Sequence, residues 1–182
     1  EKSGIDIKLI TGDPGAFDTL YNMILAKGVK NYFIMCGDDT TELDEKCGWC
    51  GADLMLYAQT LGLNTWWVSS TFNRKKTADA AGGKKIVGII AVGYGQTQGV
   101  PHKSKKAQKV SSYEGDAPPW FKEGVAAALL APTAINRQAF FIKGKGSKVS
   151  ITCNNGIYTG ADLGLVKYHF ELGAGKENFE WA

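Results

Sequence analysis

The sequence lacks several features that would assign it to a specialised class of protein. No segment approaches the roughly 18 uninterrupted apolar residues of a membrane helix, so we expect no membrane partner. The net charge of +3 is too small to indicate a nucleic-acid binder. Four cysteines in 182 residues are too few for a disulfide scaffold, which makes a reducing cytoplasm the expected location.

The short motifs of common catalytic and nucleotide-binding sites are also missing. The chain has no GxSxG, Walker or dinucleotide GxGxxG sequence, and Gly93-Tyr94-Gly95 is interpreted only as a turn. It has no signal peptide and no initiating Met, and Glu1 leads directly into a strand-like run, so we expect that an N-terminal piece is missing. No residue is assigned a catalytic role, and the scattered histidines and cysteines predict no metal site.

The most prominent pattern that is present is a long, weakly polar helix. From Leu43 to Leu61, small or apolar residues recur at alternating spacings of four and three, which places them in one stripe along a helix. The other faces carry few charges beyond Asp53, so we expect this helix to be buried in the middle of a domain. Thr40 or Thr41 is the predicted N-cap, and Gly62 is the predicted left-handed residue at the end.

Apolar runs and turn residues predict the other elements. The expected strands are Ile5–Ile10, Tyr32–Cys36, Asn64–Val68, Ile86–Val92, Phe140–Ile142 and Val149–Cys153. The expected further helices are Phe17–Leu25, Asn73–Ala81, one that starts at Pro118-Pro119, and Ala161–Leu172, which Gly173 should end. We therefore predict an α+β fold: a mostly antiparallel sheet with packed helices and a buried central helix.

The two halves of the chain echo each other. Strand, cysteine, loop and helix follow in that order twice, with Ala52-Asp53-Leu54 in the first helix and Ala161-Asp162-Leu163 in the second. We interpret this as an internal duplication with a pseudo-twofold axis, and chance repetition in a chain rich in Leu, Ala and Gly is the alternative. The predicted organisation is one domain, residues 1–182, with a first half 1–95, a basic linker 96–119 and a second half 120–182.

Two cysteines form a CxxC motif on the first turns of the central helix. The helix dipole lowers the pKa of a thiol at this position, so Cys47 and Cys50 are candidates for thiol–disulfide chemistry. Cysteine also packs as a small hydrophobic residue, and a buried helix favours that structural role.

A corner near the start of the second half offers amides and small polar residues. In Ala131–Gln138 a helix runs into Pro132, and Asn136 and Gln138 follow just before a strand. Such amides can bind the edge of a planar heterocycle or simply cap the helix end. The lysines of the preceding basic segment can cradle a phosphate, or keep a linker solvated.

Three stretches of the chain, in this order, resemble the FMN-dependent nitroreductase family. Leu61–Val68 is similar to the family's Leu-Gly-Leu-Gly-Thr-x-Trp strand, Ala91–Gly95 to its strand ending in Gly-Tyr-Pro, and Ala131–Gln138 to its Pro-Ser-x-x-Asn-x-Gln motif. The repeated core helix resembles the single-chain branch in which two half-domains imitate the family's dimer. That branch implies either a monomer, as a pseudo-dimer, or a homodimer.

The resemblance implies an oxidoreductase in which FMN carries electrons from NAD(P)H to a nitroaromatic or quinone-like acceptor. It places Ser69, Ser70 and Thr71 against the flavin ring, Thr133, Asn136 and Gln138 on its other side, and Lys103 and Lys105 at the phosphate. The family's N-terminal Arg-x-Ser-x-Arg is absent, its Pro-Trp is replaced by Ala139-Phe140, and its Gly pair by Ser69-Ser70. The alternatives are a thiol–disulfide oxidoreductase and a flavin-binding protein without turnover.

Overall fold

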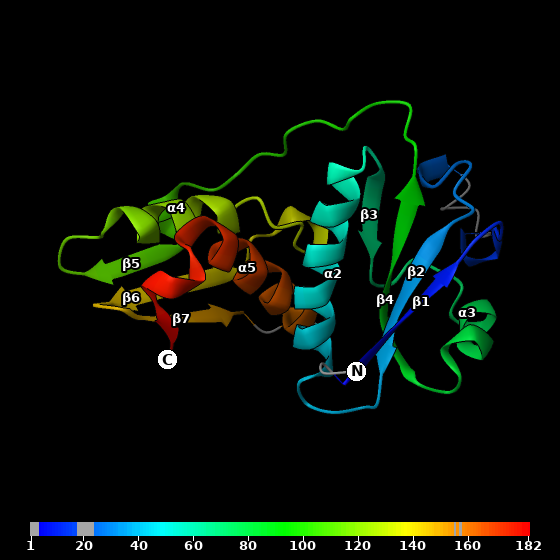
Figure 1. The fold of residues 1–182 in the computed structure, drawn as a ribbon, viewed down its shortest axis with the longest axis horizontal. Coiled ribbons are helices and arrows are strands. Elements are labelled where there is room, and N and C mark those ends of the chain that lie inside the picture. Colours follow the sequence, from blue (N-terminus) through cyan, green and yellow to red (C-terminus); the bar gives the residue numbers. More distant parts are fainter. Residues whose placement is uncertain (1–3, 18–23, 155, 157) are drawn as a thin grey trace. The chain divides into compact units, whose positions relative to one another are not determined.

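The computed structural model describes residues 4–17, 24–154, 156 and 158–182, and its α+β architecture confirms the predicted fold class (Figure 1). The described residues form two four-stranded sheets and four α-helices. Most of the predicted helix Phe17–Leu25 lies outside them. The chain splits into two compact units, one of residues Glu1–Cys47 and Asp53–Gly99, the other of Gly48–Ala52 and Val100–Ala182. The predicted division into halves and a linker stays a prediction.

The first unit is built on an antiparallel sheet with the strand order β1-β2-β4-β3. Its elements are β1 (Ile5–Ile10), the 3-10 helix η1 (Gly15–Phe17), β2 (Tyr32–Gly37), β3 (Asn64–Val68), α3 (Arg74–Ala81) and β4 (Lys85–Gly93). The apolar centres of β2 and β4 pair in the middle, with Ile34 opposite Ile89. Both residues are fully buried in one core cluster that also includes Phe17 and Ala81, so η1 and α3 cover this face.

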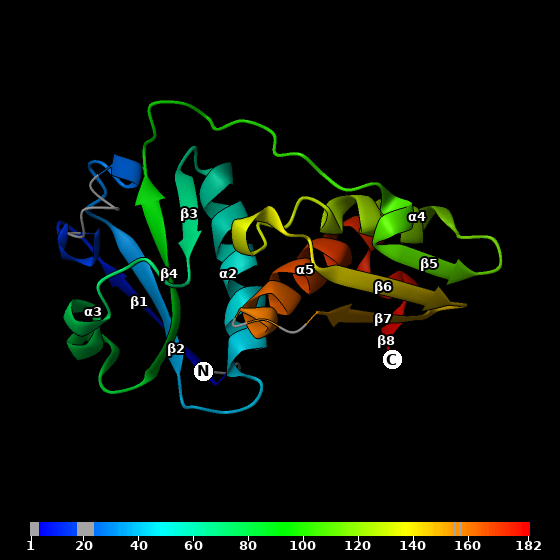
Figure 2. The same ribbon diagram turned by 180° about the vertical axis from the view of Figure 1, so that it is seen from behind.

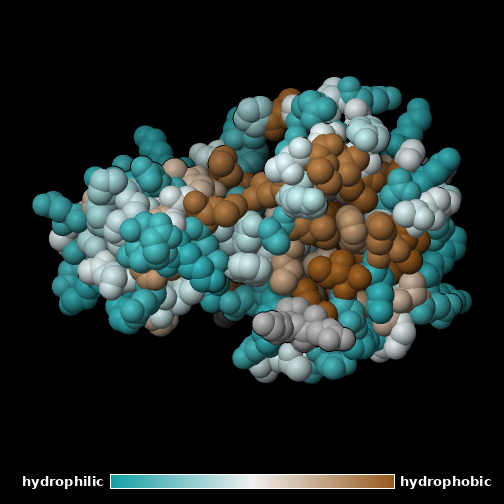
Figure 3. Space-filling view, in the orientation of Figure 1, coloured by the Kyte–Doolittle hydropathy of each residue, from teal (hydrophilic) through white to brown (hydrophobic). Residues whose placement is uncertain are grey.

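The edge strand β1 leaves part of its apolar pattern uncovered. Ile7 and Leu9 are 41% and 55% exposed, although the sequence predicted a half-buried strand. Figure 3 shows hydrophobic side chains gathered over the unit that contains this sheet, while the other unit has a mostly hydrophilic surface. The alternation along β1 therefore indicates the strand correctly but not its degree of burial.

Helix α2 (Leu43–Thr60) is the predicted long helix, and it contributes residues to both units. Its N-cap is Glu42 rather than a threonine, without a side-chain capping bond, so that part of the prediction was wrong. Gly62 has the predicted left-handed conformation, with φ of 76°. The predicted stripe is buried at its start but not at its end, where Tyr57 is 61% exposed. A stripe with a mean spacing of 3.5 residues drifts around a straight helix of 3.6 residues per turn.

The second unit has a mixed sheet with the order β5-β6-β7-β8. Its elements are β5 (Ser111–Glu114), α4 (Pro119–Ala128), β6 (Phe140–Lys145), β7 (Lys148–Cys153), α5 (Thr159–Ala174), β8 (Glu180–Trp181) and the 3-10 helices η2 (Ala107–Lys109), η3 (Ala134–Asn136) and η4 (Lys176–Asn178). The predicted antiparallel pairing holds for the β6–β7 hairpin, whereas β5 and β8 pair in parallel at the two edges. Helices α4 and α5 cover one face, and Figure 2 shows the other with the strands in front.

Two glycines allow α4 and α5 to pack closely. A Cβ on Gly124 would lie 2.6 Å from the ring of Phe170, and one on Gly173 would lie 2.6 Å from the carbonyl oxygen of Glu123. The prediction that Gly173 ends the last helix was wrong, because α5 continues to Ala174 and Gly175 follows it with φ of 72°. Gly173 is needed for close approach between the helices rather than for a left-handed turn.

A carboxylate on α5 joins two indoles within the second unit. Glu171 accepts hydrogen bonds from the Nε1 atoms of Trp49 and Trp181, at 3.0 and 2.8 Å. Only 11% of its side chain is exposed, and Lys176 lies 3.7 Å away. The charged acceptor therefore fixes both indoles, because hydrogen bonds to an ionised group are stronger than neutral ones.

The order of elements in the two units agrees with the repeated pattern seen in the sequence. In each unit an antiparallel strand pair is followed by a long helix and then by a strand that runs parallel to the second strand of the pair. These are β1, β2, α2 and β3 in one unit and β6, β7, α5 and β8 in the other. In the first unit β4 lies between the two parallel strands, and in the second β5 is added at the edge. A twofold axis between the units stays a prediction.

Candidate functional site

The segment between α4 and β6 has an unusual backbone, and we call residues Thr133–Gln138 the corner. Three of its residues that are not glycine have positive φ: Ile135 at 46°, Asn136 at 54° and Gln138 at 47°. Such a left-handed conformation costs a side-chain-bearing residue roughly 1–2 kcal/mol, and Ile is less suited to it than Asn. Strained backbone of this kind is typical of binding and catalytic sites, which supports a functional role for the corner.

A carboxylate from α5 fixes the start of the corner. Both oxygens of Asp162 accept a hydrogen bond from the backbone N–H of Ala134, at 3.0 and 3.2 Å. Burial raises the pKa of the Asp162 carboxyl above its usual value, while the bond from Ala134 and the charge of Arg137 act in the opposite direction. Sequence analysis did not select Asp162 as a site residue, although the repeated Ala-Asp-Leu sequence contained it.

Gln138 is the buried centre of the corner, with an exposed fraction of 1%. Its amide Nε2 donates to the carbonyl oxygen of Lys103 at 3.2 Å and to Oδ1 of Asn136 at 2.8 Å. Its Oε1 accepts from the backbone N–H of Lys105 at 2.7 Å, and its own backbone N–H donates to Oγ1 of Thr133 at 3.0 Å. Both amide donors of Gln138 are therefore used within the protein.

These bonds attach the basic segment to the corner, and we call residues 102–109 of that segment the arm. The side chain of Lys105 donates from Nζ to the carbonyl oxygen of Gln138 at 2.9 Å. Asn136 donates from Nδ2 to the carbonyl oxygen of Lys103 at 2.9 Å. The structure thus brings together the five predicted site residues of this unit: Lys103, Lys105, Thr133, Asn136 and Gln138.

The residues of the corner differ in what they can still offer to a ligand. Asn136 is exposed, and after its bonds to Lys103 and Gln138 it retains one N–H donor and further acceptor capacity. The ammonium of Lys103 is exposed and has no partner among the described residues. Gln138 is buried and has no donor left. The available amide of Asn136 and the backbone of Lys103 are therefore joined in one hydrogen-bonded network.

The other predicted residues, Ser69–Thr71, form what we call the turn, after β3 in the first unit. Nε1 of Trp67 donates to the hydroxyl of Ser69 at 2.7 Å, and Nη2 of Arg74 donates to the carbonyl oxygen of Ser69 at 2.9 Å. Ser70 and Thr71 are exposed. The turn and the corner belong to different compact units, so their apposition around one ligand stays a prediction.

Arg74 is a residue that the sequence analysis missed. Its guanidinium also donates from Nη1 to the carbonyl oxygen of Ile86 at 3.0 Å and lies 4.7 Å from the centre of the Phe72 ring. It therefore connects the turn to the start of β4. The only sequence signal was the basic character of the predicted helix Asn73–Ala81.

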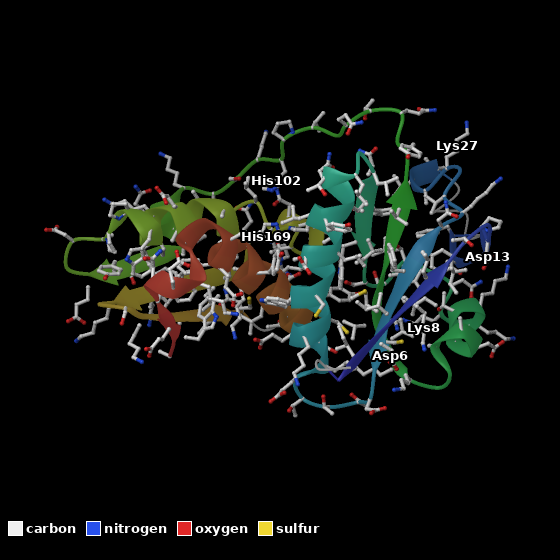
Figure 4. All side chains as sticks on the ribbon, in the orientation of Figure 1. Asp6, Lys8, Asp13, Lys27, His102 and His169 are labelled. Atoms are coloured by element: carbon white, nitrogen blue, oxygen red, sulfur yellow. The ribbon has the colours of Figure 1, made fainter. Side chains whose placement is uncertain are left out.

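The histidines and the CxxC motif show no catalytic arrangement. His169 on α5 is buried and its Nδ1 lies 2.8 Å from the carbonyl oxygen of Leu165, and burial lowers the pKa of its ring (Figure 4). His102 on the arm lies 3.5 Å from the carbonyl oxygen of Leu130. Cys47 has no exposed surface. Among the described residues, no group of three or more His, Cys, Asp and Glu side chains is placed to hold a metal ion.

Within the described part of the chain, no helix has both the length and the apolar character needed to cross a membrane.

Comparisons with known proteins agree with the fold and the sequence pattern. A structure from Thermotoga maritima, described as a "putative nitroreductase", superposes with a TM-score of 0.68 at 22% identity and covers 95% of this chain and 67% of that one. Two others, described as "putative NADH dehydrogenase/NAD(P)H nitroreductase", come from Bacteroides thetaiotaomicron and Parabacteroides distasonis. Their TM-scores are 0.48 and 0.46, with identities of 18% and 17%, and they cover 59% of this chain and 70% and 71% of their own.

Curated protein sequences gave no match. The family model described as "Putative TM nitroreductase" matches residues 1–174. This match includes the turn, the arm and the corner, and extends over most of the chain. The chain therefore belongs to the "Putative TM nitroreductase" family.

Proposed function

We propose that this protein is an FMN-dependent oxidoreductase that passes electrons from NAD(P)H to a nitroaromatic or quinone-like acceptor. Membership of a nitroreductase family assigns the class of chemistry, which is oxidation and reduction. Bound FMN would supply the redox chemistry itself, so the protein has to provide binding, orientation and electrostatics. The observation that supports this proposal most strongly is the corner, where the exposed amide of Asn136 donates to the backbone of the exposed Lys103.

The groups at the corner suit an anionic heterocycle such as FMN. The exposed amide of Asn136 can pair with the polar edge of a flat ring, because it retains both a donor and an acceptor. The exposed ammonium of Lys103 can meet a phosphate as a point charge. The closed bonds of Gln138 and Thr133 would keep these two groups in position. FMN thus fits the chemistry of this donor set.

The turn would contribute the remaining contacts. Arg74 and Trp67 fix Ser69, and the exposed residues Ser70 and Thr71 follow it in the turn. In the proposed complex they lie against the flavin ring and the corner lies on its other side. If each unit contributes half of the binding site, the repeated order of elements in the two units has a functional explanation. The protein would act as a monomer or a homodimer in the cytoplasm.

The two alternative functions make different demands on the structure. Thiol–disulfide exchange needs an accessible thiolate, whereas Cys47 is completely buried and Cys50 is partly buried. A flavin-binding protein without turnover would use the same corner and turn. The structure therefore favours flavin chemistry over thiol chemistry, and only an activity measurement separates an enzyme from a binding protein.

The test combines binding with turnover. We expect the purified chain to bind FMN with a shift in flavin absorbance, and to oxidise NADH or NADPH when a quinone or nitroaromatic acceptor is added. Lys103→Ala should weaken FMN binding and reduce its dependence on salt, because a phosphate contact is largely electrostatic. Lys106→Ala removes the same charge from the same arm and is the matched control. Failure to bind FMN, or binding without any oxidation of either nicotinamide, would reject the proposed enzyme.

A further inference from the structure

We propose that Gln138 is a positioning residue that clamps the arm to the corner and thereby gives the protein its preference for a phosphorylated flavin. This inference rests on the proposed function. Gln138 would not contact the flavin itself, because both of its amide donors are already engaged. Its effect would pass through Lys103, whose exposed ammonium extends from the backbone that Gln138 holds.

The amide of Gln138 closes two long-range connections at once. Its Oε1 accepts from the backbone N–H of Lys105 at 2.7 Å and its Nε2 donates to the carbonyl oxygen of Lys103 at 3.2 Å, across 33 and 35 positions of the sequence. One planar group therefore holds the backbone on both sides of Ser104. With Gln138 only 1% exposed, water cannot readily replace these bonds. Removing the amide leaves the part-buried backbone N–H of Lys105 without its acceptor, while the carbonyl oxygen of Lys103 keeps the bond from Asn136.

The two arm lysines have different roles in this arrangement. The ammonium of Lys105 donates to the carbonyl oxygen of Gln138 at 2.9 Å, so its charge is used to fasten the arm. The ammonium of Lys103 has no partner within the described part of the chain. Asn136 and Gln138 both donate to the carbonyl oxygen of Lys103, which fixes the backbone from which that ammonium extends.

The backbone conformation of Gln138 also supports its role as a positioning residue. It has φ of 47°, a conformation that glycine would adopt without strain. Gln provides the side chain that makes the clamp, and the clamp holds the strained backbone in return. Thr133, with only 5% of its surface exposed, adds a bond from its hydroxyl oxygen to the backbone N–H of Gln138. A glycine at this position would relieve the strain and lose the clamp.

The first test needs no flavin. Hydrogen exchange of the Lys105 backbone amide is measured in the flavin-free wild type and in Gln138→Leu. We expect the exchange of this amide to accelerate by roughly tenfold or more, since it loses its acceptor. The amide of Ile142, which donates to the carbonyl oxygen of Val110 at 2.8 Å, is the internal reference and should keep its rate. Unchanged exchange at Lys105 would overturn the clamp, whether or not FMN binds.

The second test measures phosphate discrimination as the ratio of riboflavin to FMN dissociation constants. We expect this ratio to fall by roughly tenfold in Gln138→Leu, because FMN affinity falls further than riboflavin affinity when the released arm no longer places Lys103. If this variant does not fold, Lys105→Ala, which keeps every amide bond of Gln138, should give a smaller fall in the same direction. Lys106→Ala is the control for charge. An unchanged ratio in Gln138→Leu would overturn the positioning role. If that variant does not fold, an unchanged ratio in Lys105→Ala would overturn it. A wild type that binds no flavin would reject the proposed function instead.

Discussion

The corner and the turn are two short polar segments of similar predicted purpose, and they are built in opposite ways. The corner has three strained residues, a buried glutamine and hydrogen bonds that close on one another. The turn has two exposed hydroxyl residues, and its support comes from outside, through Trp67 and Arg74. The corner thus combines bonds within itself, at a cost in strain, with bonds to the arm and to Asp162, whereas the turn is supported by the side chains of Trp67 and Arg74.

This difference has a consequence for binding. A ligand at the corner meets groups whose geometry is already fixed, so little conformational entropy is lost on binding. The turn offers the exposed hydroxyl of Ser70, whose hydrogen rotates to suit a partner. We therefore expect the corner to set affinity and the turn to adapt.

Removing the carboxylate beneath the corner should have the largest effect on stability. Asp162→Ala leaves the backbone N–H of Ala134 without its acceptor, and we expect a loss of about 1–2 kcal/mol in the free energy of unfolding. Urea denaturation measures this change. Asp162→Asn keeps one acceptor oxygen and should retain most of the stability. Equal stability of all three proteins would mean that the corner does not depend on this bond.

The same carboxylate predicts an unusual pH dependence. Burial raises the pKa of Asp162 in the folded state, so protonation favours folding, and this contribution is lost as the pH rises through the folded pKa. As the pH is lowered from about 7 to about 3.5, we expect the wild type to gain stability relative to Asp162→Asn, which cannot take up this proton. A shift in the opposite direction would show that the hydrogen bond from Ala134 outweighs burial.

The amide that faces the ligand should control flavin affinity. Asn136→Ala should weaken FMN binding by roughly tenfold, equivalent to about 1.4 kcal/mol, because a polar edge of the flavin loses its partner. Asn136 has φ of 54°, and alanine would add strain there. Asn136→Gly removes the amide without that strain and is the better probe. If Asn136→Gly binds FMN like the wild type, the corner does not contribute this contact.

The external support of the turn should contribute less. Arg74→Lys cannot keep both guanidinium bonds, to the carbonyl oxygens of Ser69 and Ile86, and we expect a loss of about 1 kcal/mol in unfolding free energy. Proteolysis near the turn should also become faster. Lys75→Ala, at the next exposed position of α3, is the matched control. A turn that stays equally resistant in Arg74→Lys would contradict the role assigned to the arginine.

The smallest expected effect has the opposite sign. Ile135 is 91% exposed and has φ of 46°, so its side chain gains little from packing while the backbone is strained. Ile135→Asn should stabilise the protein by about 0.5–1 kcal/mol, because asparagine tolerates this conformation. Thermal unfolding measures the gain. If flavin binding weakens in the same variant, the exposed isoleucine is part of the binding surface.

Patterns that depend on neighbouring residues were predicted well from the sequence. The strand Asn64–Val68 follows from its β-forming residues, and the start of α4 at Pro119 follows from the fixed φ of proline. Strand β5 was missed because Ser111–Glu114 has no apolar pattern and is stabilised by pairing with β6. Gly173 was misread because its role depends on Glu123 of another helix, which no local pattern reveals.

At the corner, the residue types were predictable but their conformations were not. Asn136 and Gln138 stood out as amides at the end of a helix, and both lie in the corner together with the arm. Positive φ at Ile135 has no local signature, because isoleucine rarely adopts it. The bonds of Gln138 depend on Lys103 and Lys105, more than thirty positions earlier. Only the folded chain shows that one amide supports the site while its neighbour remains available.

The shared acceptor of Trp49 and Trp181 gives the second unit an optical signal of its own. Indole emission is sensitive to the electric field of a nearby charge, and the Glu171 carboxylate lies within hydrogen-bonding distance of both rings. Glu171→Gln keeps the shape of the side chain but removes the charge and replaces one of the two acceptor oxygens with an NH2 group, so the emission of both tryptophans should change. The fluorescence of this pair would then report the integrity of α5 during unfolding.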